Sequence, residues 1–179
     1  TYPHSGKDYE ELMKNADSAM YRAKESGRNN YKFFSVEMNM LVDQQFAIER
    51  DLRLALEQEQ LELYYQPIVK ASTGKLIGAE ALIRWNNPAM GLISPDKFIP
   101  LAEETGLIIS IGDWVLKTAC KDIKQWQQNT GMDLTIAVNV SPRQFRDGNF
   151  IKTVDQVLTD TQLDPQFLEL EITERLILD

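Results

Sequence analysis

The sequence predicts an α/β fold in which largely parallel strands alternate with helices. Two observations lead to this prediction. Short segments such as residues 134–139 alternate their side chains with the period of two that is typical of strands. Longer segments such as residues 108–128 carry apolar residues at the three- and four-residue spacing of amphipathic helices. Because the two patterns follow one another through residues 61–172, we expect βα units and a largely parallel sheet.

The composition is that of a soluble globular protein. Of 179 residues, 43% are hydrophobic and 26% are charged, and no apolar run approaches the roughly 20 residues that cross a bilayer. We therefore expect this segment to make no membrane contact. A single cysteine, Cys120, excludes an internal disulfide and a cysteine-rich zinc site, so we expect a cytoplasmic location, with a membrane anchor upstream left open. The net charge of -8 argues against binding of a nucleic acid polymer.

Residues 8–26 form the first predicted element, an amphipathic helix. Gly27 follows it as a terminator, and a short strand is expected over residues 29–34. The segment 35–60 contains neither proline nor glycine, and its apolar residues make a broad, imperfect stripe, which predicts a long connecting helix. Because no strict heptad persists, packing against the next domain is favoured over a dimerising coiled coil.

Two predicted strands follow, over residues 61–69 and 76–85, with a turn between them. On the second strand, Glu80 and Arg84 share one face with three other residues. A charged pair on an apolar strand must be paired, solvated or used on a ligand. Along a strand that rises about 3.3 Å per residue, the two residues are roughly 13 Å apart. A ligand that spans both is therefore favoured over an internal ion pair.

The later elements place two further polar residues near strand ends. A short helix starts at Ser94 and Pro95, a longer one covers residues 108–128, and another lies within residues 150–160. Asn139 ends the strand 134–139, and Glu171 lies near the end of the strand 167–172. Since βα barrels place their sites where strands end, chemistry is expected here.

Glu80, Asn139 and Glu171 all offer oxygen ligands. Such a set suits magnesium, manganese or calcium far better than zinc or copper. Each residue also has an ordinary structural interpretation: a paired strand carboxylate, an amide that caps a loop, and an acid near a helix start.

Five segments resemble the EAL domain, a family of cyclic-di-GMP phosphodiesterases, and they occur in the family's order. They are residues 64–69 (Tyr-Tyr-Gln-Pro-Ile-Val), 80–85 (Glu-Ala-Leu-Ile-Arg-Trp), 98–103 (Phe-Ile-Pro-Leu-Ala-Glu), 138–141 (Val-Asn-Val-Ser) and 168–174 (Leu-Glu-Leu-Glu-Ile-Thr-Glu). The resemblance implies a TIM-like (β/α)8 barrel, hydrolysis of cyclic-di-GMP to linear pGpG, dependence on Mg²⁺ or Mn²⁺, and possible homodimerisation through the EAL domain.

The resemblance also implies a role for each site residue. Glu80, Asn139 and Glu171 correspond to metal ligands, and Glu174 corresponds to a residue that steadies a neighbouring loop. Arg84 corresponds to a contact with a substrate phosphate. Gln66 corresponds to a second substrate contact, although a polar residue near a strand end is also common without a ligand.

The resemblance divides the chain into three parts. Residues 15–34, with Asn-Ala-Asp-Ser-Ala-Met-Tyr-Arg-Ala-Lys at 15–24, resemble the last helix and strand of a GGDEF domain, the family that makes cyclic-di-GMP. We therefore expect residues 1–34 to be the end of a GGDEF domain, residues 35–60 a connecting helix, and residues 61–179 the N-terminal half of an EAL domain.

The predicted barrel is incomplete. Residues 61–179 are roughly half of the about 250 typical of a complete barrel. The family's two adjacent aspartates, lysine and further glutamate would follow Asp179. We therefore expect these residues to belong to a longer polypeptide, called the intact protein below, and to be inactive alone. A non-catalytic cyclic-di-GMP receptor is the alternative function.

Overall fold

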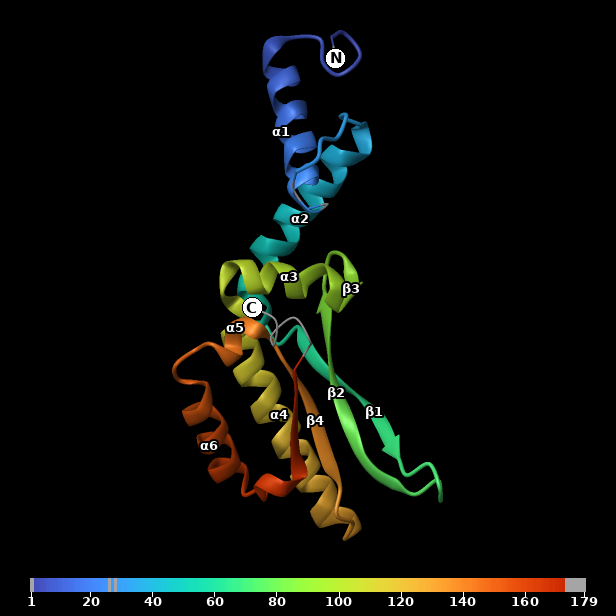
Figure 1. Ribbon diagram of the computed structural model, residues 1–179, viewed down its shortest axis with the longest axis vertical. Coiled ribbons are helices and arrows are strands. Elements are labelled where there is room, and N and C mark those ends of the chain that lie inside the picture. The colour runs from blue at the N-terminus through green and yellow to red at the C-terminus, as the bar shows by residue number, and fades with distance from the viewer. Residues whose placement is uncertain (1, 26, 28, 173–179) are drawn as a thin grey trace. The chain divides into compact units, whose positions relative to one another are not determined.

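The computed structural model describes residues 2–25, 27 and 29–172 (Figure 1). The chain divides into two compact units, Thr1–Arg50 and Asp51–Asp179. Within the described residues, no helix combines the length with the apolar character that crossing a bilayer requires.

The first unit contains α1 (Tyr9–Glu25) and most of α2 (Val36–Ala55). At the start of α1, the Asp8 carboxylate accepts a hydrogen bond of 2.8 Å from the Glu11 backbone N–H. The helix ends before Gly27, whose φ of 102° is left-handed. Asn39 of α2 donates to the buried Asn15 of α1 at 2.9 Å, so a polar contact joins these two helices.

Two expectations for this region need correction. Residues 29–34 were expected to form a strand, but residues 29–34 are irregular in the structure. A strand needs a neighbouring strand to satisfy its backbone groups, and none of the described segments pairs with this one. The helix expected over residues 35–60 ends at Ala55, and Glu59 takes a left-handed φ of 54° in the turn that follows.

The second unit is built on a mixed sheet. Its main strands are β1 (Leu61–Val69), β2 (Leu76–Asn87), β4 (Thr135–Val140) and β5 (Leu168–Ile172), in the spatial order β1-β2-β4-β5. The strands β2, β4 and β5 are parallel, as predicted. The strand β1 is antiparallel to β2 because the connection between them is a short turn, which cannot join parallel neighbours. A short strand, β3 (Gly91–Ile93), pairs with the C-terminal end of β2.

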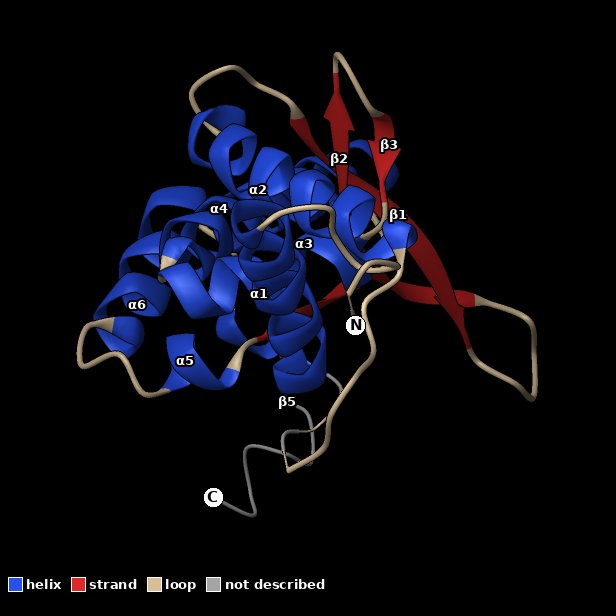
Figure 2. Ribbon diagram, turned by 90° about the horizontal axis from the view of Figure 1, so that it is seen from above, coloured by secondary structure: helices blue, strands red, loops and turns tan. Residues whose placement is uncertain are grey.

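The longest helix of this unit, α4, packs on one face of the sheet, and the other helices pack against α4 on that side (Figure 2). They are α3 (Pro95–Thr105), α4 (Leu107–Thr130), α5 (Pro142–Phe145) and α6 (Phe150–Thr161), and a 3-10 turn, η1 (Pro165–Phe167), precedes β5. Trp85 and Phe98 are fully buried between β2 and α3, with ring centroids 5.5 Å apart in an edge-to-face arrangement. Truncating a buried aromatic residue of this kind costs about 3–5 kcal/mol, so this pair anchors α3 to the sheet.

Because side chains alternate along each strand, polar side chains lie on the face of the sheet that the helices do not cover. Ala79 and Ala81 of β2 are buried toward the helices, whereas Glu80 between them is half-buried on the other side. On β4, Val138 is buried and Asn139 is exposed. The face opposite the helices is called the polar face below. The predicted mixed α/β fold with a parallel-strand sheet is therefore confirmed.

Candidate functional site

The pairing of the strands gathers four of the expected site residues on the polar face. Gln66 of β1 lies directly opposite Glu80 of β2, and Asn139 of β4 lies beside Glu171 of β5. Glu80 is in register with Ala137, two residues before Asn139 on the same face of β4. Since residues paired in register project to the same side, these side chains belong to one surface of the sheet.

A hydrogen bond joins the two central residues of this surface. The Asn139 Nδ2 donates to the Glu80 Oε1 at 2.7 Å, although the two residues are 59 positions apart in the sequence. The amide is exposed and the carboxylate is half-buried. Because the amide nitrogen is turned toward Glu80, the Asn139 Oδ1 is the atom of this side chain that is available as an oxygen ligand.

Arg84 lies farther along β2 on the same face. Its guanidinium carbon is 5.3 Å from the centroid of the Tyr64 ring, and its Nη1 donates to the Ile83 carbonyl at 2.8 Å. The contact with Tyr64 is a cation–π interaction, which holds the guanidinium over β1. Arg84 therefore contacts Tyr64 and not Glu80, in agreement with the prediction that the two charges do not form an internal pair.

A cavity of about 500 Å³ opens at the carboxyl ends of β2 and β4. Arg84 and Asn139 line it from the strands, and Ser141 and Gln144 line it from the turn that follows β4. Apolar side chains of α3 and α4 form much of the remaining wall: Ile99, Ile108, Ile111 and Val115. The volume is within the roughly 300–1,000 Å³ of small-molecule sites, and the mixture of apolar walls and few polar groups is typical of them.

Glu171 and Gln66 are exposed on the polar face, outside the lining of this cavity. Glu174 lies outside the described residues. Sequence reasoning missed Tyr64, although it lies two residues before Gln66 and therefore shares its face. It also missed Ser141 and Gln144 as parts of the cavity wall. The Ser-Pro pair at residues 141–142 was visible as a turn signal, but the contact of Gln144 with Gly112 of α4 was not.

The donor set fits a hard divalent cation in its chemistry. Glu80 and Glu171 supply carboxylates and Asn139 supplies an amide oxygen, and such oxygen ligands suit Mg²⁺ and Mn²⁺. Among the side chains that the structure describes, no three His, Cys, Asp or Glu residues are arranged so that they could hold a metal ion. The set of Glu80, Asn139 and Glu171 is not a group of this kind, because Asn139 is an amide.

Three titratable groups around α4 have shifted pKa values, and all three favour their neutral forms. Burial raises the pKa of Cys120 to about 12. Burial, and then the hydrogen bond of 2.6 Å that its hydroxyl donates to Asp122, raise the pKa of Tyr65. Burial, and then the nearby Asp147 charge, raise the pKa of Asp113. The Tyr65 ring also packs edge to face on a tryptophan of α4, so its role is structural.

Comparison with known proteins agrees with the motifs and the fold. Residues 49–179 match the EAL domain, and the chain belongs to this family. The bifunctional diguanylate cyclase/cyclic di-GMP phosphodiesterase MucR of Pseudomonas aeruginosa is 49% identical over 173 residues, which are 97% of this chain and 25% of MucR. The cyclic di-GMP phosphodiesterase NbdA of the same organism is 41% identical over 173 residues, which are 97% of this chain and 22% of NbdA.

A solved structure of the MucR phosphodiesterase in a c-di-GMP complex has the same fold. It superimposes with a TM-score of 0.69 at 48% sequence identity, and the match covers 72% of this chain and 52% of that one. The chain spans about a quarter of the length of the curated relatives MucR and NbdA.

Proposed function

We propose that the intact protein is a divalent-metal-dependent phosphodiesterase that hydrolyses cyclic-di-GMP to linear pGpG. One observation carries this proposal: the Asn139 amide is hydrogen-bonded to Glu80 at 2.7 Å while Glu171 lies beside Asn139 in register. Three neighbouring parallel strands thus bring three oxygen ligands to one face in a chain of the EAL family. Arg84, on the same face, adds a cation for an anionic substrate.

Glu80, the Asn139 Oδ1 and Glu171 would hold Mg²⁺ or Mn²⁺. When bound, such a cation supplies a water nucleophile at neutral pH and stabilises charge on the phosphodiester. The hydrogen bond between Asn139 and Glu80 fixes the orientation of both side chains before any ligand arrives. Such preorganisation reduces the cost of assembling a site.

Arg84 and Gln66 would bind the substrate beside this set. The Tyr64 ring holds the Arg84 guanidinium in place, and a fixed guanidinium suits the geometry of a phosphate. Gln66 is exposed directly opposite Glu80, where its amide can reach a bound nucleotide. The proposal assigns Glu174 to support of a neighbouring loop.

The proposal extends to the organisation of the intact protein. Residues 61–179 would form the first half of a TIM-like barrel whose later strands supply further ligands, so the 179 residues alone would be inactive. Residues 1–34 would end a GGDEF domain, and residues 35–60 would connect the two domains. We further propose a cytoplasmic location for these residues and a homodimer formed through the EAL domain.

A non-catalytic cyclic-di-GMP receptor is the second candidate. The cavity beside Arg84 favours it, because apolar walls next to a fixed cation can hold a nucleotide without any metal. The two candidates predict different outcomes for a bound dinucleotide. The enzyme converts it to pGpG, whereas the receptor releases it unchanged.

The test uses the intact protein, stripped of metal with EDTA and supplied with cyclic-di-GMP. Chromatography should detect pGpG after Mn²⁺ is added and none before. The Glu80→Gln variant should lose more than about 100-fold of the turnover, since even outer partners of a metal ligand cost about 10–100-fold. Calorimetry gives the dinucleotide affinity in parallel. Tight binding without pGpG in the presence of Mn²⁺ would establish the receptor and contradict the enzyme.

A further inference from the structure

The turn that follows Asn139 is closed by its own side chains. The Ser141 Oγ accepts a hydrogen bond from the Arg143 backbone N–H at 3.1 Å, and the Ser141 N–H donates to the Gln144 Oε1 at 3.2 Å. The Ser141 side chain also accepts from the Gln144 backbone N–H, so Ser141 and Gln144 form a capping box at the start of α5. The turn begins only two residues after Asn139, so its position determines where β4 ends.

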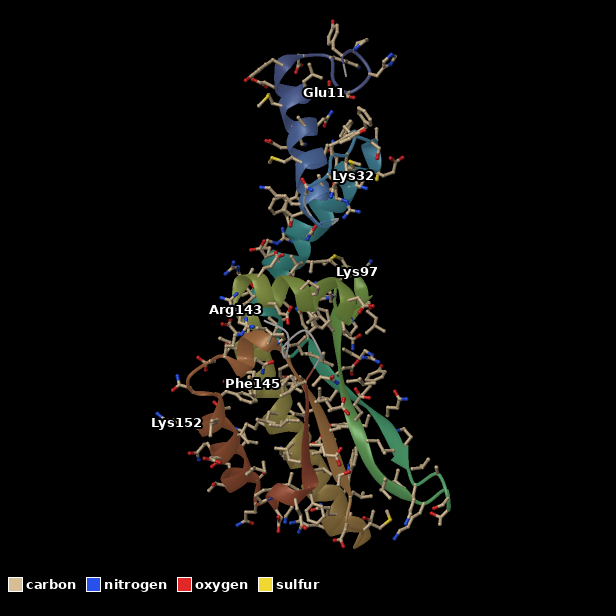
Figure 3. All side chains as sticks on the ribbon, in the orientation of Figure 1. Glu11, Lys32, Lys97, Arg143, Phe145 and Lys152 are labelled. Atoms are coloured by element: carbon tan, nitrogen blue, oxygen red, sulfur yellow. The ribbon has the colours of Figure 1, made fainter. Side chains whose placement is uncertain are left out.

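Arg143 fastens this turn to α3. Its Nη1 donates to the backbone carbonyls of Glu103 and of Glu104, the latter at 3.0 Å, although the residues are about forty positions apart in sequence. Arg143 is labelled in Figure 3. These carbonyls belong to the last turn of α3, where helical partners are missing and a cation is favourable.

The chain leaves room for this contact at Gly106. The residue has a left-handed φ of 85°, and a Cβ atom there would lie 3.1 Å from the Arg143 Nη2. Glycine therefore serves both the backbone conformation and the approach of the guanidinium.

Gln144 fastens the same turn to α4. Its side chain is buried, with 5% of its surface exposed, and it packs against the Gly112 backbone. A Cβ atom on Gly112 would lie 1.7 Å from the Gln144 Nε2, so the contact requires glycine at this position of α4. The turn is thus held from two sides, by α3 through Arg143 and by α4 through Gln144.

We propose that Arg143 is a positioning residue for the metal site: by holding the turn against α3, it keeps the Asn139 side chain in place beside Glu80. This inference rests on the function proposed above. Arg143 is exposed and lies outside the lining of the cavity, so it acts through Asn139 and makes no substrate contact itself. Positioning partners of metal ligands typically contribute about 10–100-fold to metal affinity.

The experiment measures two affinities of the intact protein. Mn²⁺ binding is followed by the electron paramagnetic resonance signal of free Mn²⁺, and cyclic-di-GMP binding is measured by calorimetry in EDTA. Arg143→Ala should weaken Mn²⁺ binding by about tenfold or more and leave the dinucleotide affinity within about twofold. Arg143→Lys should recover part of the loss, because an ammonium group can still reach one carbonyl.

Arg146→Ala is the matched control, since it removes the same charge from the same turn without touching the carbonyls of α3. Circular dichroism checks folding, and Arg143→Lys serves as the test variant if Arg143→Ala does not fold. Equal Mn²⁺ affinity in the Arg143 and Arg146 variants would overturn the inference, as would an equal loss of both affinities. A wild type that neither binds Mn²⁺ nor forms pGpG would instead defeat the proposed function and the inference with it.

Discussion

Gly78→Ala should destabilise the sheet at the place where β2 meets β4. A Cβ atom at Gly78 would lie 2.3 Å from the Thr135 Oγ1 and 2.6 Å from the Thr135 carbonyl oxygen. The two residues are partners in the parallel pairing of these strands, so the obstruction is backbone as well as side chain. Overpacking of this kind costs about 1–3 kcal/mol, and the lower entropy of the unfolded alanine chain offsets about 0.4–1 kcal/mol.

Because backbone atoms of Thr135 cannot move aside as a flexible side chain can, the upper half of this overpacking range applies. The expected net loss is therefore about 1–2.6 kcal/mol in the free energy of unfolding, or a fall of about 2–10 °C in the unfolding temperature. Thermal unfolding followed by circular dichroism measures it. Gly148→Ala is the matched control because nothing lies within 4 Å of its Cβ position and its φ is not left-handed. It should change stability by less than about 0.5 kcal/mol. If Gly78→Ala is no less stable than the control, the close approach of β2 and β4 is wrong, and with it the basis for placing Glu80 beside Asn139.

Three further predictions concern the site, the core and the chain itself. Arg84→Ala in the intact protein should weaken cyclic-di-GMP binding by about 10- to 150-fold, as expected for a lost charge-assisted hydrogen bond, whereas Lys75→Ala, which removes an exposed charge from the β1–β2 turn, should not. Unchanged affinity in Arg84→Ala would remove this residue from the site. Burial raises the pKa of Cys120 to about 12, so at pH 8 its thiol should react with a disulfide reagent at least about a hundredfold more slowly in the folded chain than in the urea-unfolded chain. For the same reason, the folded chain should lose stability as the pH rises above about 8.5, where the thiol ionises in the unfolded chain but not in the folded one. Equal reaction rates would contradict the burial of this residue. The 179-residue chain alone, given cyclic-di-GMP and Mn²⁺, should form no pGpG, and product formation that Glu80→Gln abolishes would refute the need for further strands.

Much of the second unit could be predicted from periodicity. The strand that ends near Asn139 and the helix with Ile111 and Val115 on its buried face were both visible in the sequence, because burial on one side dictates the spacing of apolar residues. The same logic placed Glu169 and Glu171 on one face of their strand. Local signals also sufficed for the starts of helices, as with Ser94 before α3 and Pro95 as its first residue.

Strand register, and contacts between segments that are distant in the sequence, could not be predicted in this way. The hydrogen bond between Glu80 and Asn139 depends on which residue of β2 lies beside which residue of β4, and no local pattern carries that information. The cation–π contact of Arg84 with Tyr64 depends likewise on the register of β1 against β2. The expected strand over residues 29–34 failed for a related reason, since β propensity does not form a strand without a partner.

In the proposed function, Glu171 acts with Glu80 and Asn139 in one metal-dependent site. The most direct measurement compares Mn²⁺-dependent pGpG formation by the intact protein carrying Glu171→Gln or Glu169→Gln. Both residues are exposed carboxylates on the same face of β5, but Glu171 is in register with Asn139, whereas Glu169 is in register with Ala137. We expect Glu171→Gln to lose more than about 100-fold of the turnover and Glu169→Gln to stay within about threefold of the wild type. Equal turnover in the two variants would contradict the assignment of the site to these strand ends.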